Sequence, residues 1–293
     1  MPIAILGPTA SGKSAVAVAV ARCLGGTVVN ADPYQAIQGL AIGTGQPDEA
    51  ERAEVPHLGY GLLPLSARPN PAAFGAQVRG WLSECREPVL VTGSGLYLRG
   101  VWGQLSALPE VPAPLVARVR RWGADLGTPA LHRYLAAVDP SRASDLHPND
   151  AARVHRALAL HLATGRAPSS LLSGPAADVP EGWRVLVVTP DREHRRHRVA
   201  ARVATQVRAG WPEEVARLVR SGHAGDLAAL RPLGYAAWMA GGDPGAIQAA
   251  VVQETQAYAK RQATWFRNQL AGAQIWDPDA EEVAVALQRL GLS

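Results

Sequence analysis

The chain has 293 residues, of which 47% are hydrophobic, and a formal net charge of +4 to which Arg contributes far more than Lys. This length suffices for one large domain or for a core domain with an insertion, and the mean hydropathy near zero is that of an ordinary globular protein. Cys23 and Cys85 form no CxxC pair, and no apolar run reaches membrane-spanning length, which argues against a disulfide framework, a structural zinc site and a membrane protein.

Charge and the first residues give three further expectations. A mildly basic balance attracts polyanions, and both nucleic acids and diphosphates fit it. Met1 leads directly into strand-like residues, which leaves no room for a signal peptide, so we expect a cytoplasmic protein, acting as a monomer and without a membrane partner. Cys23 lies in an apolar helical pattern and is expected to be a small buried side chain.

In chain order, short apolar runs alternate with longer helical patterns, which is typical of an α/β fold with a mostly parallel sheet. The first strand is expected at residues 3–6, and an Ala- and Val-rich helix at 14–24 follows it. Further buried strands are expected at 27–30, 89–91 and 185–189.

The turn between the first strand and this helix matches the phosphate-binding loop pattern. Its residues are Gly7, Pro8, Thr9, Ala10, Ser11, Gly12, Lys13 and Ser14. The glycines allow several backbone N–H groups to point into one concavity, and the start of the following helix adds to the attraction for phosphate. Lys13 is expected to neutralise phosphate oxygens, and the Ser14 hydroxyl to help hold Mg²⁺. A nucleoside triphosphate is the usual ligand of such a loop.

Between about residues 109 and 183 the pattern changes to helices alone, separated by Pro and Gly. These helices are expected at 115–122, 129–138 and 150–164, and two long Arg-rich helices follow the resumed strand pattern, at 192–208 and 247–270. We therefore predict an α/β phosphate-loop core with a mostly parallel sheet flanked by helices, made of residues 1–108 and 184–293. An all-helical insertion domain is predicted over residues 109–183.

Several motifs along the chain resemble those of the tRNA dimethylallyltransferase (tRNA isopentenyltransferase) family. Besides the phosphate loop they are Asp32-Pro33-Tyr34-Gln35, Ile42-Gly43-Thr44 with Pro47, Val55-Pro56-His57, Gly93-Ser94-Gly95-Leu96-Tyr97, His147-Pro148-Asn149-Asp150, Leu233-Gly234-Tyr235 and the string from Tyr258 to Phe266. The last string is the most specific after the phosphate loop, because kinases that share this loop have no reason to carry it. The sequence departs from the family pattern at Pro33, Ala41, Gln46, Thr92, Ser94, Ala236 and Gln256.

The resemblance implies transfer of a dimethylallyl group from dimethylallyl diphosphate to the exocyclic N6 amine of the tRNA adenosine at position 37, just 3′ of the anticodon. The phosphate loop, with Arg231, would then hold the donor's diphosphate rather than ATP. The partners implied are the tRNA anticodon stem-loop and dimethylallyl diphosphate, and the cofactor is Mg²⁺. The adenosine must leave the base stack to reach such a pocket.

Asp32 is our candidate general base, because a carboxylate on the adenine amine can accept its proton as the C–N bond forms. Its alternative role is that of a helix cap or an indirect Mg²⁺ partner. Lys13 stabilises the leaving diphosphate. Ser94 is a further catalytic candidate that could hydrogen-bond the adenosine or the diphosphate, although its position also suits simple turn chemistry.

The candidate tRNA-binding residues lie in four segments. They are Asp32, Pro33, Tyr34 and Gln35, then Ser94, then Arg153 and Arg156 of the insertion, and finally Lys260 and Arg261. The Arg run at 192–208 is a further candidate for lining an RNA channel, although charge runs are more often solvated faces.

Two alternatives remain open at this point. A phosphate-loop kinase of small molecules or nucleotides would turn over ATP and would not need the C-terminal motif. A tRNA-binding paralogue with weakened catalysis is suggested by the departures at Pro33, Ala41 and Ala236, whereas the intact Lys13 and Asp32 speak against it.

Overall fold

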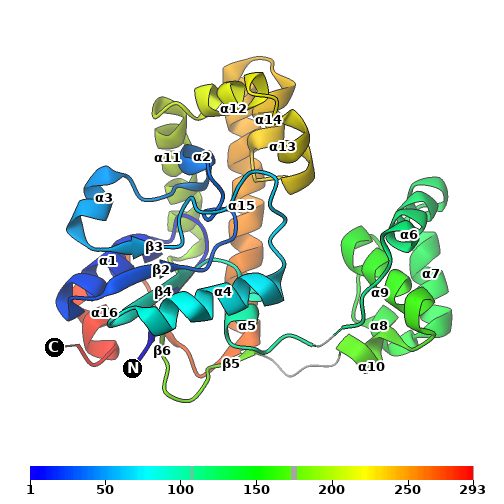
Figure 1. The fold of residues 1–293 in the computed structure, drawn as a ribbon, viewed down its shortest axis with the longest axis horizontal. Coiled ribbons are helices and arrows are strands. Elements are labelled where there is room, and N and C mark those ends of the chain that lie inside the picture. Colours follow the sequence, from blue (N-terminus) through cyan, green and yellow to red (C-terminus); the bar gives the residue numbers. More distant parts are fainter. Residues whose placement is uncertain (107, 173–176, 293) are drawn as a thin grey trace. The chain divides into compact units, whose positions relative to one another are not determined.

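The computed structural model describes residues 1–106, 108–172 and 177–292. Its contacts divide the chain into two compact units, Met1–Gln104 with Ala176–Ser293, and Leu105–Pro175. Figure 1 follows the chain through both. The boundaries differ from the predicted 109–183, because residues 177–183 group with the first unit. They include the short strand β5 (Ala177–Asp178), so the predicted all-helical region is not helical to its end.

A six-stranded parallel sheet forms the centre of the first unit in the described residues, with the strand order β3-β2-β4-β1-β6-β8. The strands are β1 (Ile3–Leu6), β2 (Thr27–Asn30), β3 (His57–Leu58), β4 (Pro88–Thr92), β6 (Arg184–Val188) and β8 (Gln274–Trp276). A separate pair joins β5 to β7 (Leu270–Ala271). The predicted strands are confirmed, each to within one residue at either end.

The strand order determines which loops meet at one edge of the sheet. β4 lies between β1 and β2, with Ile5 opposite Val91 and Val29 opposite Leu90. Because all three strands are parallel, their carboxyl ends still meet at one edge of the sheet. The loops after β1, β2 and β4 therefore converge there, as is usual for ligand sites in such sheets.

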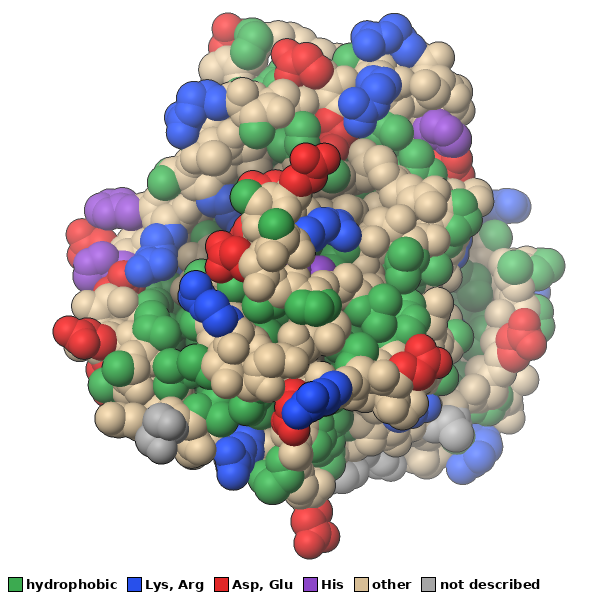
Figure 2. All heavy atoms as spheres, turned by 60° about the vertical axis from the view of Figure 1, so that its left-hand side comes forward, with side chains coloured by type: hydrophobic (Ala, Val, Ile, Leu, Met, Phe, Trp, Pro, Cys, Tyr) green, Lys and Arg blue, Asp and Glu red, His purple; other side chains and the backbone are tan. Residues whose placement is uncertain are grey.

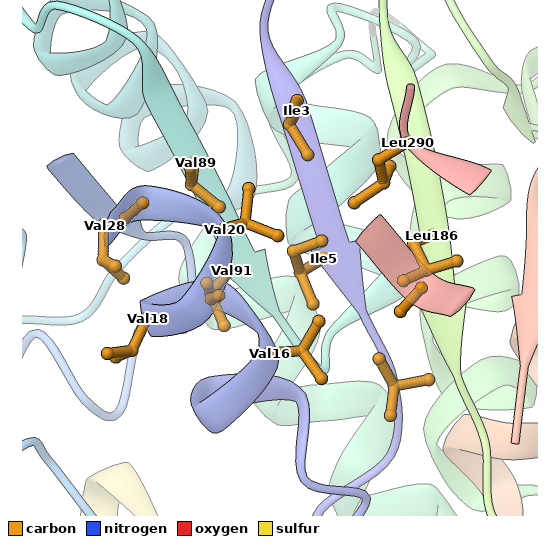
Figure 3. Packing of buried hydrophobic residues seen from close by; sticks show 14 of the residues in the cluster. Ile3, Ile5, Val16, Val18, Val20, Val28, Val89, Val91, Leu186 and Leu290 are labelled. Atoms are coloured by element: carbon orange, nitrogen blue, oxygen red, sulfur yellow. The ribbon is translucent and has the colours of Figure 1, made fainter. Parts of the chain in front are cut away.

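Helices cover both faces of this sheet. Strand residues alternate between two apolar clusters, since successive side chains of a strand point to opposite faces. One cluster joins Ile3 and Ile5 to α1 (Lys13–Leu24) and α16 (Val283–Arg289), as Figure 3 shows. The other joins Ala4 and Leu6 to α4 (Pro71–Glu84), α5 (Gly95–Val101) and the C-terminal half of α15 (Pro244–Gln269).

A third apolar cluster of the first unit is largely helical. It is built from α11 (Arg192–Arg208), α12 (Trp211–Arg220), α13 (Ala224–Leu230), α14 (Tyr235–Ala240) and the N-terminal half of α15, packed on Ile37 and Leu40. Two short helices, α2 (Ala41–Thr44) and α3 (Glu49–Glu54), precede β3. This cluster holds α11 beside α15.

The second unit has its own core. Its helices are α6 (Ala113–Leu126), α7 (Thr128–Val138), α8 (Pro140–Ser144), α9 (Ala151–Thr164) and α10 (Pro168–Leu172). Val119, Leu135 and Leu158 are fully buried within it, and the buried Asp139 accepts the backbone N–H groups of Arg142 (3.0 Å) and Ser169 (2.6 Å). A core of this kind lets the unit fold as a body of its own.

Two other expectations concern single features of the chain. Among the described helices, including the 26-residue α15, none has both the length and the hydropathy of a membrane span. Cys23, expected to be buried, is exposed on α1, because the apolar face of that helix is formed by Val16, Ala17 and Val20 instead.

Candidate active site

The phosphate loop is wound tightly between β1 and α1. Three of its residues have positive φ angles, Gly7 (157°), Ala10 (61°) and Gly12 (91°). A side chain at Gly7 would meet the backbone oxygen of Val188 on β6 at 2.3 Å, so this position requires glycine. Ser11 is fully buried, and its hydroxyl accepts the N–H of Lys13 at 3.3 Å. The loop thus forms a concavity at the N-terminus of α1, where anions bind well.

Lys13 extends from this loop with its charge only partly compensated. Its Nζ donates to the backbone oxygen of Pro8 at 3.4 Å. Burial, together with the neighbouring Arg202, lowers the pKa of Lys13 to about 8, although the Asp32 carboxylate opposes the shift. A cation in such surroundings favours the arrival of an anionic ligand.

Asp32 lies just past β2, and its backbone is held by the fully buried Asn30. The side chain of Asn30 accepts the N–H of Asp32 (2.8 Å) and donates to the backbone oxygens of Asp32 (2.9 Å) and Gly59 (2.8 Å). The Asp32 carboxylate itself accepts the N–H of Tyr34 at 3.0 Å, which is the cap-like bond that the sequence left open. Burial raises the pKa of Asp32, while Lys13 and this N–H oppose the rise. The group is therefore more basic than an exposed aspartate.

Gln262 on α15 connects two of the loops. Its Oε1 accepts the N–H of Thr9 at 2.8 Å, and its Nε2 donates to the oxygen of Gly93 at 2.8 Å. A side chain at Gly93 would meet Nε2 of Gln262 at 2.7 Å and Nζ of Lys13 at 3.6 Å. The loops after β1 and β4 are therefore fixed to each other through one buried amide.

The short helix α2 forms another wall and is held by two side chains from elsewhere in the sequence. The buried Glu214 of α12 accepts the N–H groups of Ile42 (2.8 Å) and Gly43 (3.1 Å) and the hydroxyl of Tyr235 (2.6 Å). Gln206 of α11 donates to the oxygens of Ile42 (2.8 Å) and Gly43 (3.1 Å). The wall is thus set by contacts across more than 160 residues.

These parts enclose a cavity of about 250 Å³. Six of the residues predicted from the sequence line it: Thr9, Lys13, Asp32, Tyr34, Gln35 and Arg231. Others were not assigned to it, namely Arg202, Gln206, Trp211, Thr255, Tyr258 and Gln262. Their only signal in the sequence is spacing, since Arg202 with Gln206, and Thr255 with Tyr258 and Gln262, recur at helical intervals. Arg202, expected in an RNA channel, faces this cavity instead.

The remaining predicted residues lie outside the set that lines the cavity. Ser94 is the N-cap residue of α5, and its N–H donates to the hydroxyl of Thr92 at 3.0 Å. Ser14 is exposed on the first turn of α1. Arg261 lies 5.8 Å from the centre of the Tyr258 ring, a cation–π distance. Arg153 and Arg156 are exposed on α9 of the second unit, where Arg153 pairs with Asp150 at 3.2 Å.

Of the residues that depart from the family pattern, Ala41 and Ala236 are exposed, whereas Pro33 is buried. Gln46 donates to the backbone oxygen of Ile37 at 2.8 Å and so serves the loop's own structure.

A second hollow, of about 450 Å³, lies between α11 and α15, and we call it the basic groove. Its charged lining residues are all cationic: Arg192, Arg195, Arg196, Lys260 and Arg267. Burial, with Arg267 nearby, lowers the pKa of Arg195. On the face that Figure 2 presents, Lys and Arg are scattered among Asp and Glu. A groove lined by five cations therefore differs from that mixed surface and suits a polyanion.

Comparison with known proteins bears on this arrangement of phosphate loop, carboxylate and basic groove. The family model described as IPP transferase matches residues 35–269, and the one described as isopentenyl transferase matches residues 2–56. A protein of Rhodospirillum centenum named tRNA dimethylallyltransferase is 42% identical over 94% of this chain and 92% of its own length. The chain belongs to the tRNA dimethylallyltransferase family.

Other members of the tRNA dimethylallyltransferase family agree in extent and fold. The Halorhodospira halophila member is 36% identical over 97% of this chain and 95% of its own. The solved tRNA isopentenylpyrophosphate transferase of Bacillus halodurans shares 27% identity with a TM-score of 0.68, over 99% of this chain and 96% of its own. A eukaryotic dimethylallyltransferase solved acting on tRNA matches in fold, with 19% identity, a TM-score of 0.73, and coverage of 97% and 77%. The α/β fold and the family resemblance predicted from the sequence are both confirmed.

Proposed function

We propose that this protein transfers the dimethylallyl group of dimethylallyl diphosphate to the N6 amine of a tRNA adenosine just 3′ of the anticodon, releasing diphosphate. The observation that carries the proposal is that a phosphate loop and a partly buried carboxylate line one cavity, with Lys13 and Asp32 both facing it. The names of the family members in other organisms support the same donor and acceptor.

The reaction requires the protein to stabilise negative charge on the leaving diphosphate and to accept a proton from the attacking amine. The bond between the allylic carbon and the diphosphate oxygen breaks, while a new bond forms from that carbon to the amine nitrogen. Loop N–H groups and Lys13 stabilise the charge that develops on the diphosphate. Asp32 accepts the proton that the amine loses, and its raised pKa makes it a better acceptor than an exposed carboxylate. Arg202, at the same cavity, adds a second cation for the leaving group.

Mg²⁺ fits this site as an ion held chiefly by the donor's phosphate oxygens, with few ligands from the protein. The described residues contain no cluster of three or more His, Cys, Asp or Glu side chains able to hold a metal. Mg²⁺ in phosphate sites commonly keeps few protein ligands and is held by phosphate oxygens. The Ser14 hydroxyl, exposed at the start of α1, is the protein oxygen that would bind it. The ion would add to the charge neutralisation of the diphosphate.

The acceptor nucleotide would approach past Tyr34 and Arg231, which are the exposed members of the cavity wall. The hydroxyl of Tyr34 donates to the backbone oxygen of Leu230 at 3.1 Å, so its ring is held in place for stacking. Gln35 donates from its amide nitrogen to the oxygens of Thr44 (3.0 Å) and Gly45 (2.8 Å). Its carbonyl oxygen is therefore the group that can meet a base.

We further propose that the tRNA backbone is held by the basic groove and by Arg153 and Arg156 of the second unit. Phosphate contacts of this kind supply affinity and register without reading the sequence. Lys260 lines the groove, and Arg261 follows it on the same helix.

Purified protein, Mg²⁺, labelled dimethylallyl diphosphate and unmodified tRNA test the function directly. We expect label in one adenosine per tRNA after digestion to nucleosides, and none when guanosine replaces that adenosine. Dimethylallyl diphosphate should also raise the melting temperature more than ATP at equal concentration, since stabilisation follows occupancy of the folded state. Equal or stronger protection by ATP, with phosphoryl transfer to a small acceptor, would instead support the kinase alternative.

A further inference from the structure

The cavity has two distinct ends, which α11 and α15 define by running along it in opposite directions. At the phosphate-loop end, Nη1 of Arg198 lies 3.5 Å from the Cβ position of Gly12, and Gln262 binds Thr9. Two turns further along α11, Gln206 binds α2 instead. Thr255 precedes Gln262 by seven residues on α15, which is about 10 Å along a helix. The cavity therefore extends about two helical turns away from the phosphate loop.

The far end is lined by two side chains that are nearly buried, Trp211 and Thr255, which are only 2% and 5% exposed. Gly43, Leu233 and Gln206 complete it. The Thr255 hydroxyl donates to the backbone oxygen of Val251 at 2.7 Å, so this side chain is not free to donate to a ligand. The mouth lies elsewhere, at the exposed Tyr34 and Arg231. A ligand whose charged group occupies the phosphate loop would thus meet the indole of Trp211 at its other end.

Trp211 cannot move out of this position easily. Its indole makes an edge-to-face contact with Tyr235 (5.7 Å between ring centres, 65° between planes) and a tilted contact with Trp238 (6.4 Å). A side chain at Gly43 would approach the indole to 2.2 Å, and one at Gly234 to 2.6 Å, so both glycines make room for it. A close-packed ring of this kind acts as a rigid stop.

We infer that Trp211 limits the length of the prenyl chain that the donor may carry to about five carbons; this inference rests on the proposed function. The cavity of about 250 Å³ is below the roughly 300–1,000 Å³ of ordinary ligand pockets, and it must also admit the adenine amine. A ten-carbon donor adds one five-carbon unit at the end remote from the diphosphate. That unit would need the space that the indole occupies.

Trp211→Leu and Thr255→Ala enlarge the far end independently, and Trp238→Leu is the matched control, because Trp238 belongs to the same aromatic cluster without lining the cavity. For each we would measure kcat/KM with geranyl diphosphate and with dimethylallyl diphosphate and take their ratio. Since one methylene in an apolar pocket changes selectivity by about 10- to 200-fold, Trp211→Leu should raise the geranyl to dimethylallyl ratio at least tenfold. Thr255→Ala should raise it a few-fold, and Trp238→Leu should leave it unchanged.

Wild-type protein that uses both donors equally well would overturn the inference. So would an unchanged ratio in a Trp211→Leu protein whose melting curve shows it to be folded. If that variant does not fold, Thr255→Ala decides by the same ratio. Absence of transfer from either donor by the wild type would be a different result, because it would refute the proposed function itself.

Discussion

Lys13 and Asp32 carry opposite pKa shifts for the same physical reason. Burial disfavours the charged form of each, so the pKa of the lysine is lowered and that of the aspartate is raised, while their mutual attraction opposes both shifts. Each pKa is thus moved toward neutral pH, which is the range in which a general base is most effective. The opposite shifts yield two testable consequences.

Asp32→Asn keeps the shape of the side chain and the contact to Tyr34 N–H but removes the proton acceptor. We expect the rate of the chemical step to fall by about two to four orders of magnitude. Single-turnover transfer to tRNA measures it, and Asp243→Asn, at the exposed N-cap of α15, is the control. Retention of more than about a tenth of the wild-type rate would mean that another group takes the proton. Affinity for tRNA should change little.

The pKa of Lys13 near 8 predicts a pH dependence of donor binding. Below this value the ammonium is charged and attracts the diphosphate, and above it the free protein loses that charge. We therefore expect the Kd of dimethylallyl diphosphate to rise as the pH increases from about 7 to 9. Calorimetric titration over this range tests it, and Lys13→Arg, which stays charged, should flatten the curve. A flat wild-type profile would contradict the shifted pKa.

The sequence could predict those site residues that lie together in one short motif. Lys13 and Asp32 lie in short motifs next to strands, so the sequence predicted both their chemical roles and their positions at the ends of those strands. Arg202 and Gln262 could not be assigned, because each is an ordinary polar residue in a long helix until the fold brings it beside the loop. Gln262 meets Thr9 across 253 positions, a contact that no local pattern encodes.

At the scale of elements, the strands of four or five residues and most helices of three or more turns were predicted well, although the 14-residue helix α4 was not predicted. The sequence did not predict the two- and three-residue strands β3 and β8 or the short helices α2 and α3. Segments this short contain too few residues to show a periodic pattern of apolar side chains. The order of the strands, with β4 between β1 and β2, was not predicted, since it depends on which helix packs on which face of the sheet. These short elements matter here, because α2 forms a wall of the cavity.

Glu214 of α12 should be essential to that wall. All three of its partners, Ile42 N–H, Gly43 N–H and Tyr235 O–H, are donors, so Glu214→Gln turns an amide NH₂ toward a donor. We expect a loss of roughly 1–3 kcal/mol in the free energy of unfolding and a raised KM for the donor. Denaturant unfolding and steady-state kinetics measure the two effects. Glu213→Gln, one position earlier and exposed, should change neither; equal effects would show that α2 does not depend on this carboxylate.

At the scale of the whole molecule, the cationic side chains proposed to bind tRNA belong to two folded units. The second unit has a hydrophobic core of its own, separate from the sheet. Its exposed cations are therefore open to substitution without disturbing donor binding. The resemblance assigned Arg153 and Arg156 to tRNA, and their exposure on α9 is compatible with phosphate contacts.

Arg153→Ala with Arg156→Ala should weaken tRNA binding and make its salt dependence shallower. Losing two phosphate contacts reduces the slope of log K against log salt by about 1.4–1.8. The melting temperature should not change, because the Arg153–Asp150 pair is exposed and such pairs add little. Arg22→Ala on α1 is the matched control, since Arg22 is similarly exposed (65% against 67%) and also pairs with an acid. An unchanged slope in the double variant would remove the second unit from the tRNA-binding surface.

The central place of β1 in the sheet has a consequence for how the protein is made. β1 leaves the ribosome before the other strands of its sheet, and one of its edges pairs with β4, but its other edge pairs with β6, which follows the entire second unit. At about 5–20 residues per second, the ninety-odd residues between β4 and β6 take roughly 5–20 seconds to translate. During that interval the helical unit, whose contacts are local, has everything it needs to fold, while β1 presents an unpaired edge that other chains could join. The helical second unit can therefore fold before the first unit is complete. β1, the strand that precedes the phosphate loop, cannot pair with β6 until the whole second unit has been translated.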